Sequence, residues 1–214
     1  MLLVSGRGQD INTFPLWNGA SYIWAWGPYS SETYGQTFTA AATQNDLLSM
    51  TFEIEAMNSS PYNFQAYVFQ WTGTDTTGGP LFTSVATAAP TGTSVFVPVT
   101  INTGGLNLTP GQQYVAFFSV NGLNNGPNGE ARWGYLGTAS SSGADGYSGG
   151  NFVFNDNTST TFAGGWLNPS FYGDAAANDL AFQLAFAPVP EPSTISLACL
   201  GVLALSSRLR RPVL

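Results

Sequence analysis

The sequence predicts an all-β protein, an antiparallel two-sheet sandwich of jelly-roll type, followed by a short C-terminal hydrophobic helix. Apolar and polar residues alternate at many places along the chain, as they do in strands with one buried face. Turns rich in Gly, Pro and Asn separate these stretches. Charged residues make up only 8% of the chain and aromatic residues 14%, which favours a packed β domain over a disordered one.

The expected strands follow from these patterns. Residues 50–56 and 180–186 alternate strictly, so each is expected to have one solvent-facing side. Residues 63–71 are apolar on both faces, which favours a central strand or one with a covered outer face. Residues 94–101 alternate too, but Pro98 lacks an amide donor, which indicates a sheet edge or a bulge. Further strands are expected at residues 22–26, 36–40, 114–120, 132–136 and 151–155, the fourth of them within an exposed loop over 122–150.

The charged side chains exclude several function classes. The chain contains no lysine and no histidine, so Ser-His-Asp and Cys-His nucleophiles, Schiff-base chemistry and imidazole metal sites are absent. Before the C-terminal tail the only cationic side chains are those of Arg7 and Arg132, whereas eleven of the twelve acidic residues lie in this part of the chain. Such a surface repels phosphate backbones, so we expect no nucleic-acid binding. The single cysteine, Cys199, lies in the tail and does not identify the compartment.

The tail has the features of a membrane segment. A helix over residues 193–207 would be ~22 Å long, which is short for a bilayer core of ~30 Å. A buried core helix is the alternative, but the run is apolar all round and follows a Pro-rich break, so we favour membrane insertion. Positive charge at the far end fits a stop-transfer signal, supplied by Arg208, Arg210 and Arg211. The expected anchor residues are Ile195, Leu197, Leu200, Val202, Leu203 and Leu205.

The order of features in the tail resembles the PEP-CTERM protein-sorting domain. Val189, Pro190, Glu191 and Pro192 precede the apolar run, and the arginine cluster ends it. The resemblance implies a Gram-negative bacterial protein whose tail is recognised by an exosortase, held in the inner membrane as a precursor and then placed at the cell surface or outside it. It also implies an association with extracellular polysaccharide and biofilm matrix. We therefore expect a β-sandwich domain over residues 1–187 and a sorting signal over 188–214.

The resemblance also implies an N-terminal secretion signal. The first ten residues, MLLVSGRGQD, have no basic region at their start and only three consecutive apolar residues after Met1. We therefore expect the signal peptide to be missing from this chain and the true start to lie upstream.

An aromatic stretch is the first candidate site in the body. Tyr22, Trp24 and Trp26 alternate, so on one strand they would share a face at a spacing of ~7 Å. Exposed rings at that spacing can stack on successive sugar units, whereas core packing is the commoner fate of such rings and the one that we favour. Weaker candidates of the same kind lie near loops, at Trp71, Trp133, Trp166 and Tyr172.

Acidic and amide residues supply the remaining candidates. Glu53 and Glu55 would share a strand face ~7 Å apart, as a glycosidase pair could, but they lie on the polar side of a clean alternation. Asn155, Asp156 and Asn157 offer oxygen ligands without the spacing of a calcium loop, so we favour a turn. We expect no catalytic residues, no metal site and no cofactor.

Three hypotheses result for the function. The first is an exported, non-enzymatic surface or matrix protein, the second a carbohydrate-binding module that contacts exopolysaccharide, and the third a glycan-active enzyme. Exposure of the Trp24 and Trp26 rings distinguishes the first two. The third requires two carboxylates that line one pocket.

Overall fold

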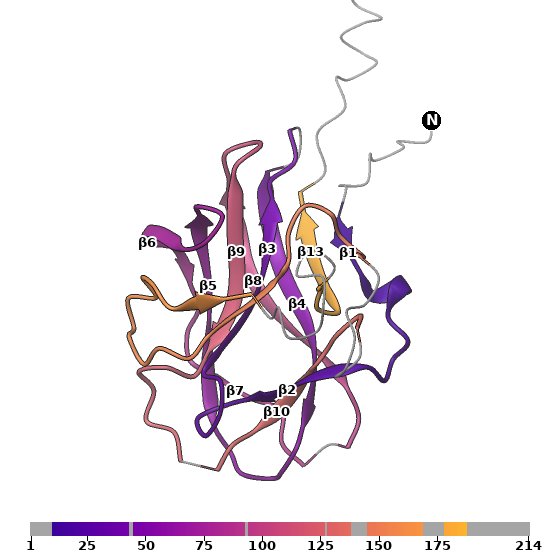
Figure 1. The fold of residues 1–214 in the computed structure, drawn as a ribbon, viewed down its shortest axis with the longest axis vertical. Coiled ribbons are helices and arrows are strands. Elements are labelled where there is room, and N and C mark those ends of the chain that lie inside the picture. The colour runs from indigo at the N-terminus through magenta and orange to yellow at the C-terminus, as the bar shows by residue number, and fades with distance from the viewer. Residues whose placement is uncertain are drawn as a thin grey trace, which may run out of the picture.

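Two antiparallel sheets face each other in the computed structural model of the protein (Figure 1). The structure describes residues 10–42, 45–92, 94–126, 128–137, 145–168 and 178–187. The tail features predicted at Val189 to Arg211 lie outside the described residues, as does Tyr172.

The strand order is that of a jelly roll. The first sheet, sheet A, contains in spatial order β1 (Ile11–Asn12), β13 (Phe182–Phe186), β4 (Asp46–Ala56) and β8 (Val97–Asn107). The facing sheet, sheet B, contains in spatial order β3 (Thr33–Thr39), β9 (Gln113–Ser119), β5 (Asn63–Trp71) and β6 (Thr76–Thr83). Every pair within these layers is antiparallel, and consecutive strands repeatedly cross between the layers, which confirms the predicted fold class.

Short strands extend both layers. In sheet A, β10 (Ala131–Gly134) pairs with the end of β4, beyond the pairing with β13, and β2 (Tyr22–Trp26) pairs with β10. Figure 1 shows β2 and β10 crossing one end of the sandwich. In sheet B, β11 (Phe152–Asn155) and β12 (Trp166–Leu167) continue past β3, and β7 (Thr87–Ala88) pairs with β5. A 3-10 turn, η1 (Phe14–Leu16), lies between β1 and β2.

The core between the sheets is centred on Trp133 of β10. Its side chain is fully buried, and its ring centroid lies 4.8 Å from that of Phe52, 5.1 Å from that of Trp26 and 5.4 Å from that of Phe118. The short strand predicted over 132–136 is therefore present, but its expected place in an exposed loop, with Trp133 as a weak surface candidate, is wrong. The strand is only four residues long, and the Gly- and Ser-rich sequence around it gave no sign that one of its faces is buried in the core.

Two other predictions are confirmed. Among the described strands β8 pairs with β4 alone, so Pro98 lies on a sheet edge, where its missing amide donor costs no ladder bond. The outer face of β5 is covered, because Phe162 packs on Tyr67, Phe69 and Phe117. Phe162 belongs to the segment between β11 and β12, which crosses the sheet in orange in Figure 1.

The central ring makes a test of the core. Replacing Trp133 with Ala should lower the free energy of unfolding by about 3–5 kcal/mol, because a cavity replaces a ring packed on all sides. Trp24→Ala is the matched control, since that tryptophan is 55% exposed and its loss should change stability by less than about 0.5 kcal/mol. Chemical denaturation measures both values. Equal effects of the two substitutions would contradict a core built around Trp133.

Candidate functional site

An open groove lies on the outer face of sheet A, where β2 and β10 meet the end of β4. Its volume is about 530 Å³, within the usual range for small-ligand pockets. Aromatic and charged side chains both line it: Trp17, Tyr22, Glu53, Glu55, Phe96 and Arg132. They come from β2, β4, β10 and from the segments that precede β2 and β8.

Strand alternation points the charged residues into the groove. In β4 the side chains of Phe52 and Ile54 are buried in the core, so Glu53 and Glu55 face outward. In β10 the burial of Trp133 likewise turns Arg132 outward. The two strands pair with Arg132 directly opposite Glu55, as expected for an ion pair across antiparallel strands.

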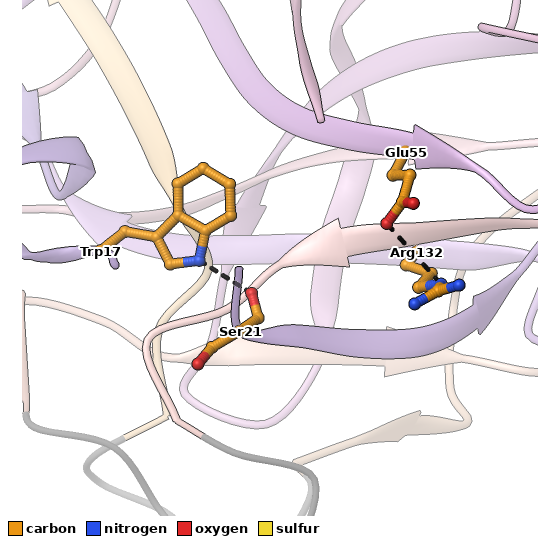
Figure 2. Close-up of polar contacts among 4 residues, drawn as sticks. All are labelled: Trp17, Ser21, Glu55 and Arg132. Atoms are coloured by element: carbon orange, nitrogen blue, oxygen red, sulfur yellow. Dashed lines mark hydrogen bonds and ion pairs between the residues drawn. The ribbon is translucent and has the colours of Figure 1, made fainter. Parts of the chain in front are cut away.

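Arg132 is held from two sides. Its Nε lies 3.7 Å from Oε2 of Glu55 (Figure 2), and its guanidinium carbon lies 4.5 Å from the centroid of the Tyr22 ring. The ion pair is partly shielded, since the two side chains are 30% and 12% exposed. The carboxylate of Glu55 and the Tyr22 ring thus both compensate the positive charge of Arg132. Arg132 is the one cationic side chain among the described residues.

Glu53 has no such partner. In the described part of the chain its carboxylate makes no hydrogen bond and no ion pair, and the side chain is half-buried. Burial raises the pKa of Glu53 above its ordinary value, because leaving water disfavours the charged form. The groove therefore carries one uncompensated carboxylate.

Gly134 leaves room for an aromatic ring beside Glu53. A Cβ added to Gly134 would lie 3.0 Å from the Cβ of Glu53 and 3.1 Å from Cζ2 of Trp17, so both side chains approach the same point on the strand. The indole Nε1 of Trp17 donates a hydrogen bond of 2.8 Å to the carbonyl of Ser21 (Figure 2), and its ring meets Phe96 edge-on at 5.0 Å. These contacts hold the ring in place before any ligand binds.

The predicted row of aromatics on β2 is not present as a single face. Tyr22 lines the groove and Trp24 is exposed outside it, whereas Trp26 is fully buried in the core, the place that we favoured for these rings, so the alternative of a glycan contact at Trp26 is wrong. The reason is a bulge: Ala131 pairs with Trp26 and Trp133 with Ile23, so β2 uses one residue more than β10 over this interval. The extra residue breaks the alternation on which the prediction depended.

The weaker candidates from the sequence occupy other places. Trp71 is nearly buried and meets the half-buried Trp166 edge-on at 5.5 Å beside a smaller cavity of about 190 Å³. Asn155 accepts a hydrogen bond of 2.7 Å from the amide of Asn157 and donates one of 2.9 Å to the carbonyl of Gly164, which is the turn that we favoured. Within the described ranges, no group of three or more His, Cys, Asp or Glu residues could hold a metal ion.

A second perturbed carboxyl, Asp179, is part of the fold. It is fully buried and accepts hydrogen bonds from the Gln36 side chain at 2.7 Å and from the amides of Gly146 and Tyr147 at 3.0 and 2.9 Å. Burial raises its pKa from 3.8 to about 6, although these bonds oppose the shift. It ties the segment before β13 to β3.

Asp179 should make stability depend on pH. Because the folded state holds the proton more tightly than the unfolded chain, its contribution is constant below about pH 4, falls as the pH rises to about 6, and is constant above, with a total loss of up to about 3 kcal/mol. Urea denaturation at pH 4 and pH 7 should show this fall in the wild type and lack it in Asp179→Asn. Asp156→Asn, which removes an exposed carboxylate, should keep the fall. The assignment would be contradicted if the free energy of unfolding changed between pH 4 and pH 7 by the same amount in the wild type and in Asp179→Asn.

The described residues contain no helix long and apolar enough to cross a membrane. The predicted anchor, Ile195 to Leu205, lies outside them.

Comparisons with known proteins find similarity at two levels. No curated protein matches the chain. The cysteine protease and lectin-like domains of Cwp84, a surface layer associated protein of Clostridium difficile, are 13% identical with a TM-score of 0.47, covering 74% of this chain and 32% of that one. A clostridial Cwp84 cysteine protease variant after propeptide cleavage is 14% identical with a TM-score of 0.49, covering 79% and 38%. This chain spans about a third of the length of each.

The family comparison concerns the tail alone. Residues 188–211 match the PEP-CTERM protein-sorting motif, which confirms the resemblance given by Val189 to Pro192, the apolar run and the arginines. The motif indicates export from a Gram-negative cell, sorting by an exosortase, and a destination at the surface or outside the cell. The chain thus carries a PEP-CTERM sorting signal at its C-terminal end.

Proposed function

We propose that this protein is a non-enzymatic component of the cell surface or extracellular matrix, whose β-sandwich binds a polysaccharide in the groove on sheet A. The observation that carries the proposal is the groove itself, in which a fixed tryptophan ring lies beside hydrogen-bonding charged groups. The sorting motif supplies the route by which the domain reaches extracellular polysaccharide.

The tail acts as a substrate in this proposal. Pro188, Pro190 and Pro192 lack amide donors and favour an extended backbone, which suits the cleft of a processing enzyme better than a helix would. The apolar run that follows would hold the precursor in the inner membrane, and the terminal arginines would keep its far end in the cytoplasm. Cleavage near the Pro-Glu-Pro sequence would then release or transfer the folded domain.

The groove has the two kinds of surface that a sugar ring requires. A pyranose has apolar C–H faces and an edge of hydroxyl groups. Trp17 and Phe96 offer apolar ring surface, while Glu53, Glu55 and Arg132 offer acceptors and donors. The groove is open, as a site for a segment of a long polymer must be.

The same carboxylates bear on the enzymatic alternative. Glu53 and Glu55 line one groove, which the third hypothesis required. A retaining or inverting glycosidase needs one carboxyl as a proton donor and the other free to act as nucleophile or base. Glu55 is instead paired with Arg132, which in turn rests on Tyr22. We therefore favour binding without turnover.

Trp17 should dominate binding. Trp17→Ala should weaken the affinity of the full chain for hexose or hexosamine oligomers on the order of tenfold, because about 1.4 kcal/mol of ring contact is lost. Isothermal titration calorimetry measures the change. Trp24→Ala is the control, since this exposed ring lies outside the groove lining.

Two results would contradict the proposal. One is a loss of binding in Trp24→Ala with none in Trp17→Ala. The other is hydrolysis of the oligomers, measured as new reducing ends that form with the wild type but not with Glu53→Gln.

The sorting motif should be needed for maturation. Replacing Pro190, Glu191 and Pro192 with Ala should leave the domain folded and able to bind, while the unprocessed precursor accumulates in the membrane fraction of the native host. Immunoblots of membrane and extracellular fractions measure this. Pro212→Ala is the control, because it lies beyond the matched residues. Unchanged maturation of the triple variant would overturn the sorting role.

A further inference from the structure

We propose that the groove selects sugars that carry free, protonated amino groups, and that Glu53 is the residue that binds the ammonium group. The ligand class is then a hexosamine oligomer or polymer with unacetylated amines. This inference rests on the proposed function, because it names the ligand of the same groove.

The first step is the state of Glu53. Its carboxylate is half-buried in the groove and has no hydrogen-bonding or charged partner among the described residues. A charge partly withdrawn from water costs free energy unless an opposite charge or a donor meets it. The raised pKa of Glu53 reflects that cost. A bound ammonium would remove it and would form a charge-assisted hydrogen bond.

The second step concerns the other charges of the groove. Arg132 is the one cationic side chain in the described ranges, and it is engaged by Glu55 at 3.7 Å and by the Tyr22 ring at 4.5 Å. A uronate or a sulfate at the Nη groups of Arg132 would enter a groove that two carboxylates and one guanidinium line, so the net charge around it would be negative. The charge that remains open to a ligand is therefore the negative charge of Glu53.

The third step is the position of the aromatic ring. Trp17 and Glu53 converge on Gly134, with Cζ2 of Trp17 and Cβ of Glu53 at 3.1 and 3.0 Å from the same added Cβ position. A pyranose on the exposed ring surface of Trp17 would therefore hold a ring substituent near the carboxylate. An ammonium at that place meets the carboxylate, and over the face of the indole it also meets the strongest aromatic partner for a cation.

The fourth step is the field of the whole chain. The net charge is −7 and the isoelectric point about 4.1, so the surface attracts a polycation and repels an acidic polysaccharide. This field raises the encounter rate with amine-bearing polymers of any sequence. The groove is needed to convert it into specific binding, and the experiment has to separate the two.

The test compares two ligands that differ only in charge. Calorimetry on the full chain, at about pH 6 where amines are protonated, uses a β-1,4-linked glucosamine tetramer and its fully N-acetylated form. The wild type should bind the amine form on the order of tenfold more tightly. Glu53→Gln should lose this preference by weakening the amine form alone, and Trp17→Ala should weaken both forms.

Asp156→Asn is the matched control, because it removes the same charge from an exposed side chain that does not line the groove. It should leave both affinities unchanged. An equal loss in Asp156→Asn and Glu53→Gln would overturn the inference in favour of general electrostatic attraction. Equal wild-type affinities for the two tetramers would also overturn it and leave the proposed function standing. Binding of neither the tetramers nor neutral hexose oligomers would overturn the proposed function as well.

Discussion

The burial of Trp133 is the constraint on which the rest of the structure depends. Its ring meets aromatic side chains from both sheets and closes the core at the end where β10 joins β4. Because side chains alternate along a strand, burying Trp133 turns Arg132 and Gly134 to the opposite face. The burial of Trp133 in the core therefore also determines which residues of β10 face the groove.

The groove depends on strands added to the jelly roll. β13 covers only part of β4, and the end of β4 pairs instead with β10 and, through it, with β2. Without this extension Glu55 would have no arginine opposite it and Tyr22 no cation above it. The chain has few positive charges, so the position of Arg132 decides which carboxylate of the groove is compensated. Arg132 compensates Glu55, and Glu53 is left for a ligand.

Local patterns in the sequence predicted the regular parts of the fold. The alternation in 50–56 gave the outward direction of Glu53 and Glu55, Pro98 indicated an edge strand, and the two-sided apolar run at 63–71 indicated a covered face. Each of these depends on residues close in sequence. The tail was recognised for the same reason, since its motif is a contiguous run.

The candidate site was harder to predict because it depends on distant contacts. Trp17 and Phe96 lie outside the strands and meet only when the chain is folded, so no spacing links them. A single extra residue in β2 reversed the direction of Trp26, and no turn residue in the strand indicated it. The Asn18-Gly19 pair after Trp17 is a local turn signal in the sequence. In the structure Asn18 orders this loop by accepting hydrogen bonds from two following amides.

A structure of the protein with a bound glucosamine oligomer would test the central claim most directly. We expect a pyranose ring against Trp17, with an amino group at about 2.8 Å from the Glu53 carboxylate and the Arg132–Glu55 pair intact. An oligomer bound on Trp24, or in the cavity between Trp71 and Trp166 with the groove empty, would contradict it.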